Sequence, residues 1–233
     1  FIILFYLKNG LPKMKSKTNK IYPESGVELT PFTAKNYDKT MNIFTLYFYR
    51  GFIHRAIKAM DIQPRDNILD LGCGTGRNAC IMAKYLSDDG SITGIDVSPI
   101  MEKQFHKKCA NNPNVDFSRQ RIDQSFSLSE QFDKIFISFV IHGFPHEIRQ
   151  IVLKNIYTHL KPGGRIFILD FAEFDMKDMP ALYRFIFKSI ECKYAFDFIE
   201  RNWKQILTDY NFINFEEFFF IKNYIRLLEA QKS

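Results

Sequence analysis

A glycine-rich turn directly after a short apolar run constrains this chain more than any other feature. The run Asn67–Leu71 has the sequence NILDL, and the next residues, Gly72-Cys-Gly74-Thr-Gly76, lead into a stretch with helical periodicity. Glycines at a strand-to-helix turn permit sharp bends and let a ligand approach the main chain closely. Open α/β sheets bind ligands at the carboxyl ends of their strands, so this turn predicts a binding site.

The spacing of these glycines argues against a pyrophosphate ligand. Arg77 stands where the dinucleotide fingerprint G-x-G-x-x-G has its last glycine. Asp70, two residues before Gly72, adds a carboxylate that would repel a pyrophosphate and attract a cation. The sulfonium and ammonium groups of S-adenosylmethionine meet this requirement.

Strand-like and helical stretches alternate through the middle of the chain. Apolar strands alternating with helices are typical of a parallel sheet that is covered on both faces. We therefore predict an α/β fold: a Rossmann-like, doubly wound, mostly parallel seven-stranded sheet with an antiparallel C-terminal strand pair and N-terminal helices. The predicted strands are 67–71, 91–95, 115–118, 134–140, 165–171, 213–222 and 224–228, and the predicted helices are 76–86, 98–110, 146–160 and 197–210.

The N-terminal part differs in composition from the rest. Residues 1–30 lack periodicity and are expected to form a flexible basic lead-in, with Met14 as the natural start. Five lysines fall within residues 1–20, so the net charge of +6 drops to +1 for the remainder. This near-neutral remainder gives little support to a nucleic-acid partner.

Residues 31–233 are expected to form a single domain. Helical periodicity from residue 32 to 60 predicts one or two helices, broken near Gly51. The stretch 171–200 departs from the alternation and predicts a cap or lid. Its aromatic side chains predict an apolar acceptor pocket, cation–π walls for an amine, or the core of a small helical cap. These are Phe171, Phe174, Tyr183, Phe185, Phe187, Tyr194, Phe196 and Phe198.

The cysteines and the apolar segments bear on the compartment. Four scattered cysteines, without a C-x-x-C pair, predict buried thiols in a reducing cytoplasm rather than a disulfide framework or a zinc site; they are Cys73, Cys80, Cys109 and Cys192. The apolar run of residues 1–7 is shorter than the roughly 20 residues that span a bilayer. We expect a cytoplasmic protein without a transmembrane segment, and peripheral membrane contact stays open.

Further candidate ligand-binding residues follow the next two strands. Asp96 ends the second predicted strand, where a carboxylate can accept hydrogen bonds from both ribose hydroxyls of a nucleoside. Val97 is placed to pack on adenine, and Ile122 with Asp123 is placed for its other face and amino group. Each piece alone is compatible with an ordinary turn or helix cap. Together they predict an S-adenosylmethionine site.

Three segments resemble the motifs of class I S-adenosylmethionine-dependent methyltransferases. They are LDLGCGTG (69–76), ITGIDVSPIM (92–101) and KPGGRIFILDF (161–171). Within the class, the resemblance is to the ubiquinone/menaquinone C-methyltransferase family and related small-molecule methyltransferases. It implies that the cofactor is lined by Asp70, Gly72, Cys73, Gly74, Gly76, Asp96, Val97, Met101, Ile122, Asp123 and Ser138.

The acceptor is less well defined. Quinone enzymes carry an Arg-Asn pair after the fourth strand, whereas this chain has Phe139-Val-Ile-His142-Gly143. N-P-P-[YF] and Pro-Cys motifs are absent, which disfavours modification of nucleic-acid bases. We expect a small-molecule acceptor. A quinone or phospholipid acceptor at the membrane surface and a non-catalytic S-adenosylmethionine-binding module stay open as alternatives.

Methyl transfer by in-line displacement depends mainly on positioning, and a base is needed only if the acceptor loses a proton. His142 follows the fourth strand and is the expected base, and Tyr37 is expected to close over the cofactor. Glu173 and Asp175 are candidates for orienting a polar acceptor. No metal is expected, because Pro145 interrupts the helical spacing of His142 and His146. A homodimer is possible through the strand that contains Phe218–Phe220.

Overall fold

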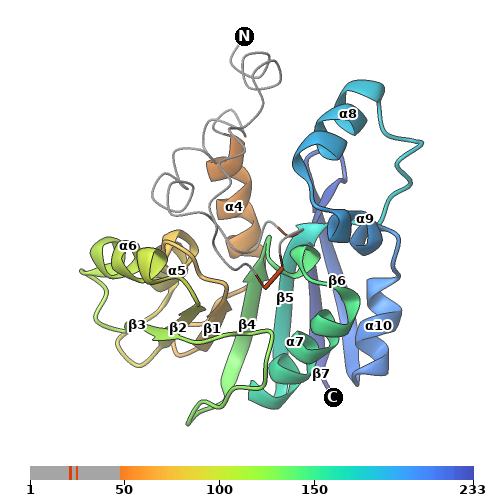
Figure 1. The fold of residues 1–233 in the computed structure, drawn as a ribbon. Helices are drawn as coiled ribbons and strands as arrows, with labels where there is room; N and C mark the ends of the chain where they lie inside the picture. Colours follow the sequence, from red (N-terminus) through yellow and green to blue (C-terminus); the bar gives the residue numbers. More distant parts are fainter. Residues whose placement is uncertain (1–20, 23–24, 26–47) are drawn as a thin grey trace.

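The fold is known from a computed structural model that describes residues 21–22, 25 and 48–233. Seven strands form one sheet in the order β3-β2-β1-β4-β5-β7-β6 (Figure 1). Neighbours among β1 to β5 pair in parallel, whereas β7 is antiparallel to both β5 and β6. The strands are β1 (Asn67–Leu71), β2 (Ser91–Asp96), β3 (Val115–Arg119), β4 (Phe132–Ser138), β5 (Leu160–Phe171), β6 (Phe212–Phe220) and β7 (Ile225–Lys232).

Helices cover both faces of this sheet, and the predicted fold class is confirmed. The α-helices are α4 (Phe48–Ala59), α5 (Arg77–Met82), α6 (Pro99–Cys109), α7 (His146–His159), α8 (Ala181–Ile190), α9 (Lys193–Ile199) and α10 (Trp203–Asp209). Two short 3₁₀ turns, η1 (Ala83–Tyr85) and η2 (Ile141–Gly143), follow α5 and β4. Of the predicted N-terminal helices, only α4 lies within the described residues.

The core has two layers because strand residues alternate between the faces of the sheet. Ile68 and Phe136 pack in one cluster with α4, α5 and α6, whereas Leu69 and Ile135 pack in the other with α7 and α10. All four of these side chains are fully buried. Burial of each such side chain contributes about 1.5–3 kcal/mol to the stability of the fold. Because both faces of the sheet are covered, these strands are apolar at successive positions and do not alternate with polar residues.

The expected break near Gly51 is wrong, because α4 continues through this residue. Glycine inside a helix costs about 1 kcal/mol relative to alanine and does not by itself end the helix. The part of α4 that follows Gly51 is anchored by Phe52, Ile53 and Ile57, which are at most 4% exposed. Tertiary packing therefore outweighs the poor helix propensity of Gly51.

Two other predicted boundaries also differ. The single helix expected over 197–210 is interrupted, and α10 begins after Asn202, whose side chain accepts a hydrogen bond from the Gln205 amide (3.0 Å). Strand β5 begins at Leu160 and includes residues 161–164, whereas the predicted strand began at residue 165. A register shift between Phe132 and Lys134 accommodates this longer strand.

The cysteine prediction requires a correction. Cys80 of α5 and Cys109 of α6 form a disulfide, with their Cα atoms 5.8 Å apart, whereas Cys73 and Cys192 are free. The two bonded residues are 29 positions apart in sequence, and only the packing of α5 beside α6 brings them together. Within the described part of the chain, no helix combines the length and hydropathy needed to cross a bilayer.

Candidate active site

The carboxyl ends of β1, β2, β4 and β5 meet at one edge of the sheet, and the glycine loop lies there. Gly72, Gly74 and Gly76 have φ angles of 71°, 53° and 77°, a region that side chains other than glycine disfavour. A Cβ on Gly72 would lie 2.5 Å from Val140 Cγ2, so a side chain is also excluded by space. The amides of Gly72 and Cys73 donate to the Ile95 carbonyl oxygen at 2.8 and 3.0 Å, which ties the loop to β2.

Asp70 is the penultimate residue of β1, just before this loop, and is 1% exposed. Its Oδ2 atom has no hydrogen-bond partner among the described residues. Burial and, secondarily, the charge of Asp96 raise the pKa of Asp70 to about 7. A buried carboxylate oxygen without a partner is unfavourable, and a bound cation would relieve both the missing interaction and the charge repulsion.

Asp96 ends β2 and connects the glycine loop to the start of α6. Its Oδ2 accepts a hydrogen bond from the Gly74 amide (3.0 Å), and its Oδ1 accepts one from the Ser98 amide (2.9 Å). Burial raises the pKa of Asp96 although these amides oppose the shift. An ionised carboxylate has about four acceptor positions, so Asp96 can still accept two further hydrogen bonds.

The apolar residues expected around adenine differ in exposure. Val97 is 46% exposed beside Asp96, whereas Met101 is 3% and Ile122 is 8% exposed. Met101 lies in the first turn of α6, and the Ser98 side chain caps this turn by accepting a hydrogen bond from the Met101 amide (3.3 Å). Val97 is therefore the open apolar surface on this side of the site.

Asp123 already has partners. Arg121 donates its Nε to Asp123 Oδ1 (2.9 Å), and the Tyr22 hydroxyl donates to Oδ2 (2.7 Å). Burial, followed by this hydrogen bond to Asp123, raises the pKa of Tyr22 to about 12. Tyr22 also packs edge-on against Phe144, with ring centroids 5.6 Å apart. Sequence reasoning missed Tyr22, which lies in the stretch expected to be a flexible lead-in.

Asn78 is a second residue that the sequence did not reveal. Its Nδ2 donates to the Oγ of Ser138 at the end of β4 (3.0 Å), and its Oδ1 is buried without a partner among the described residues. Asn78 lies in the first turn of α5, two positions after Gly76. Asp70, which precedes the glycine loop in sequence, and Asn78, which follows it, thus each offer one acceptor oxygen without a partner among the described residues.

His142 lies in η2 after β4 and is bound to Asp170 near the end of β5. The His142 Nδ1 atom is 2.8 Å from Asp170 Oδ1, and the His142 amide donates to Oδ2 (3.3 Å). The His142 Nε2 atom is 3.6 Å from Oε2 of Glu191, between α8 and α9. Burial lowers the pKa of His142, but the Asp170 and Glu191 carboxylates outweigh it, and the net pKa is raised.

Arg149 joins the His142 turn to α9. It is completely buried on α7 and donates to the carbonyl oxygens of His142 (3.1 Å) and Tyr194 (2.6 Å). It also donates to Asp197 Oδ2 (2.6 Å) and stacks over the Phe198 ring at 5.2 Å. In the sequence, Arg149 is one basic residue on an amphipathic helix, and no further pattern distinguishes it.

Aromatic rings from the 171–200 stretch lie beside His142. Phe171 has its ring centroid 5.1 Å from that of His142, and Phe187 of α8 lies 5.0 Å from Phe171. Phe187 also contacts Phe174 and Phe196, with centroids 5.8 and 5.3 Å away. Phe185 belongs to the same predicted set but is 56% exposed. These contacts make an aromatic wall beside His142.

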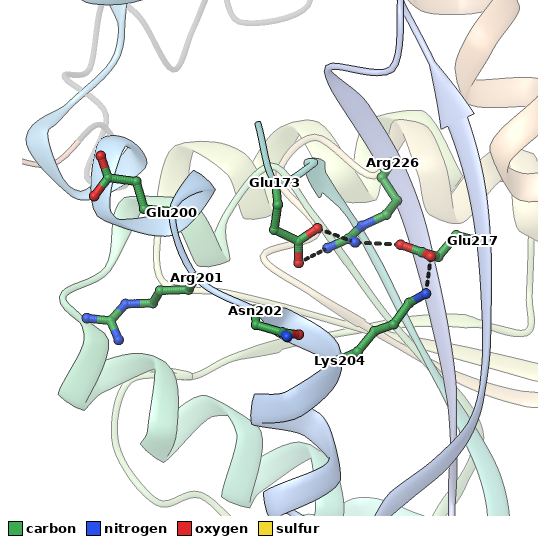
Figure 2. Close-up of a pocket in the computed structure, with 7 residues that line it drawn as sticks. All are labelled: Glu173, Glu200, Arg201, Asn202, Lys204, Glu217 and Arg226. Atoms are coloured by element: carbon green, nitrogen blue, oxygen red, sulfur yellow. Dashed lines mark hydrogen bonds and ion pairs between the residues drawn. The ribbon is translucent and has the colours of Figure 1, made fainter. Parts of the chain in front are cut away.

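The other acceptor-side candidates are placed elsewhere. Glu173 is bound to Arg226, which also pairs with Glu217, and together they line an open charged pocket with Lys204 (Figure 2). Asp175 is exposed and accepts a hydrogen bond from the Lys177 amide in its own turn (2.7 Å). Tyr37 lies outside the described residues.

Comparisons with known families and proteins indicate a methyltransferase. A family model described as a methyltransferase domain matches residues 68–164. A demethylmenaquinone methyltransferase of Staphylococcus aureus (strain JH9) is 29% identical over 188 residues, covering 79% of this chain and 77% of that protein. A demethylmenaquinone methyltransferase of Lysinibacillus sphaericus (strain C3-41) is 27% identical over 157 residues, covering 67% of this chain and 66% of the relative.

Solved structures share the fold. The N-methyltransferase NodS from Bradyrhizobium japonicum WM9, in complex with S-adenosyl-L-homocysteine, has a TM-score of 0.58 at 16% identity, covering 80% of this chain and 87% of that one. A SAM-dependent methyltransferase from Aquifex aeolicus has a TM-score of 0.57 at 17% identity, covering 78% of this chain and 89% of that one. At these identities the likeness concerns the fold alone.

Proposed function

We propose that this chain, which is a class I S-adenosylmethionine-dependent methyltransferase, transfers the methyl group to a small, largely apolar acceptor that gives up a proton. The observation that carries this proposal is the His142–Asp170 pair at the ends of β4 and β5. The pair lies next to the aromatic wall and at the same sheet edge as the glycine loop. A base is required only where the acceptor loses a proton, so the pair supports a protic acceptor.

The described residues fit S-adenosylmethionine, the cofactor of this class. The unpartnered oxygen of Asp70 provides an acceptor for a cationic group, and Asn78 Oδ1 provides a second acceptor. Asp96 retains acceptor positions for the two ribose hydroxyls, while Val97, Met101 and Ile122 supply apolar surface for adenine. When bound, S-adenosylmethionine supplies a methyl carbon that is activated by its sulfonium.

The cofactor residues expected from the sequence remain part of this proposal. The tight loop is formed by Gly72, Cys73, Gly74 and Gly76. Its glycines have positive φ angles, and because they lack a Cβ atom a ligand can approach the main chain closely. Ser138 contributes through its hydrogen bond with Asn78. Arg121 and Tyr22 already bind the two oxygens of the Asp123 carboxylate. Asp123 therefore binds the cofactor through an oxygen that also accepts a hydrogen bond from one of these residues.

His142 acts as the base in this proposal. Asp170 accepts a hydrogen bond from Nδ1–H, which leaves the lone pair on Nε2 for the acceptor. Nε2 takes the acceptor proton during transfer, and the Asp170 carboxylate stabilises the resulting imidazolium. The raised pKa of His142 makes it a stronger base than an ordinary histidine once it is deprotonated.

The surroundings of Nε2 favour a neutral or cationic acceptor. Asp170 and Glu191 place two carboxylates around His142, and the buried Asp70 and Asp96 add further negative charge near the glycine loop. An anionic acceptor would be repelled by these groups. Phe171 and Phe187 provide apolar surface for the rest of the molecule. The two relatives named as demethylmenaquinone methyltransferases support a quinone as the more specific acceptor in this proposal.

The first experiment tests whether the methylated product dissolves in organic solvent or in water. The purified chain is incubated with methyl-labelled S-adenosylmethionine and a cell extract, and the label is partitioned between organic and aqueous phases. Label in the organic phase supports an apolar or quinone-like acceptor. Label in the aqueous phase only would contradict the apolar acceptor. Cofactor binding without any transfer would favour a non-catalytic module.

The second experiment tests the base. His142→Ala is expected to slow transfer by about 10²–10⁴-fold with little change in cofactor affinity, since general bases contribute rate enhancements of that order. His106→Ala, at an exposed position of α6, is the matched control and should retain wild-type rates. A fully active His142→Ala variant would remove His142 from the mechanism.

A further inference from the structure

Helix α8 exposes large apolar side chains on its outer face. Leu182 is 65% exposed and Phe185 is 56% exposed, three positions apart on the helix. The turn between β6 and β7 lies beside α8, since the Lys222 ammonium is 4.9 Å from the centroid of the Tyr183 ring (Figure 1). Ile221 in this turn is 48% exposed. Leu182, Tyr183, Phe185 and Ile221 together form the α8–hairpin face.

Basic side chains border this face. Lys177, Lys188 and Lys222 are exposed, and Arg184 lies on α8 between the apolar residues. Two acidic side chains also occur nearby, at positions 175 and 178, so residues 175–188 and 221–223 contain four basic and two acidic groups. Exposed apolar side chains with a basic border are typical of helices that lie in the interface of an anionic bilayer.

The inner face of α8 leads to the proposed active site. Phe187 is 8% exposed and points away from the outer face, toward Phe171. Phe171 in turn contacts the ring of His142. One helix therefore separates an exposed apolar surface from the wall of the acceptor site. A continuous series of aromatic contacts, from Phe187 through Phe171, thus connects α8 with His142.

We propose that the α8–hairpin face docks on an anionic lipid bilayer, from which the site takes a lipid-soluble acceptor. This inference rests on the proposed function in that the acceptor is apolar. A second copy of the chain fits the face less well. A two-fold interface would bring basic groups such as Lys188 and Lys222 into the same contact region as their counterparts, where like charges repel.

Binding of the full chain to vesicles tests the docking surface. Flotation is compared for vesicles of phosphatidylcholine alone and for vesicles that also contain phosphatidylglycerol. We expect binding only to the anionic vesicles, and weaker binding at high salt because salt screens the lysines. L182S/F185S is expected to bind at least about tenfold more weakly, since it removes apolar area from the contact. K188E/K222E is expected to lose the preference for anionic lipid.

Ile213→Ser is the matched control, because Ile213 is 44% exposed at the opposite end of β6 from the hairpin turn. It should bind anionic vesicles like the wild-type chain. Absence of binding by the wild-type chain, or equal loss in Ile213→Ser and L182S/F185S, would overturn the proposal. Light scattering that shows a dimer broken by L182S/F185S would instead assign the face to a second copy.

A transfer assay separates this proposal from the proposed function. With an acceptor extract dissolved in detergent, L182S/F185S should transfer methyl groups at the wild-type rate, whereas with vesicle-bound acceptor it should be slower. No transfer by the wild-type chain in detergent would contradict the proposed function, even if vesicle binding follows the expected pattern. Equal rates on vesicles for both chains would overturn the docking proposal alone.

Discussion

Arg149 holds the main chain of His142 in place: its Nη2 atom donates to the His142 carbonyl oxygen at 3.1 Å. The same nitrogen donates to the carbonyl oxygen of Tyr194 at 2.6 Å, so one buried guanidinium joins the turn after β4 to α9. The position of the proposed base is thereby linked to α9, which contributes Phe196 to the aromatic wall.

Arg149→Met should destabilise the protein by about 1–3 kcal/mol, because it leaves buried carbonyl oxygens without donors. Arg201→Met is the control. Arg201 also binds Asp197, but it lies beyond the end of α9 and its side chain is 33% exposed, and an exposed ion pair contributes only about 0.2–1 kcal/mol. Urea unfolding monitored by circular dichroism gives both values. Equal effects of the two substitutions would contradict the structural role of Arg149.

Asp170→Asn should move the pH dependence of transfer. His142 must be neutral to accept a proton, so the rate rises as pH increases through the pKa of His142. Burial lowers this pKa, while Asp170 is the main group that raises it, so removing the Asp170 charge should shift the acid limb of kcat/KM to lower pH. The rate itself should fall, because Nδ1 loses its carboxylate partner. A drop in rate with an unmoved limb would indicate a purely structural role for Asp170.

Binding of S-adenosylmethionine should release a proton at slightly acidic pH. Burial raises the pKa of Asp70 to about 7 in the absence of ligand, so below pH 7 its carboxyl group is largely protonated. A cation favours the ionised form, so binding must expel this proton, and affinity should fall by up to about tenfold per pH unit below 7. Calorimetry at pH 6, in two buffers of different ionisation enthalpy, measures the release. Asp70→Asn should bind weakly and release no proton; release by this variant would assign the proton to another group.

Reduction of the Cys80–Cys109 disulfide should lower the free energy of unfolding. The bond closes a segment of 29 residues, and the chain-entropy relation gives about 3–4 kcal/mol for a loop of this size. Unfolding by denaturant with and without dithiothreitol measures the difference. Cys192→Ser is the control, since Cys192 is free and the variant should remain sensitive to reduction. An unchanged unfolding midpoint after verified reduction would contradict a stabilising role for the bond.

The cofactor side could be predicted because its residues adjoin the ends of strands. Asp70, Asp96 and Ser138 end or nearly end β1, β2 and β4, and the ends of parallel strands meet at one edge of the sheet. The signal was local: an apolar run followed by a polar residue or by glycine. The sequence therefore predicted the fold and this candidate half of the site without knowledge of any distance.

The acceptor side could not be predicted in the same way. Asp170 lay within a predicted strand, and its pairing with His142 depends on the register that sets Ser138 beside Leu169. Glu191 follows a helix that apolar periodicity did not separate from its neighbours. Cys80 and Cys109 meet only through packing of α5 on α6. These contacts join residues far apart in sequence, so they cannot be predicted from composition or from the spacing of residues.

The strand order also has a consequence for how such a chain can diverge. Strand β4 is central in the sheet. The candidate cofactor residues all precede its end or lie at it, whereas His142, Asp170, Glu191 and the aromatic wall all follow it. Because β7 runs against β5, its first residues return to the same edge and complete the acceptor side from the far end of the chain. A lineage can therefore acquire a new acceptor by mutation of its C-terminal half while it inherits an unaltered donor half.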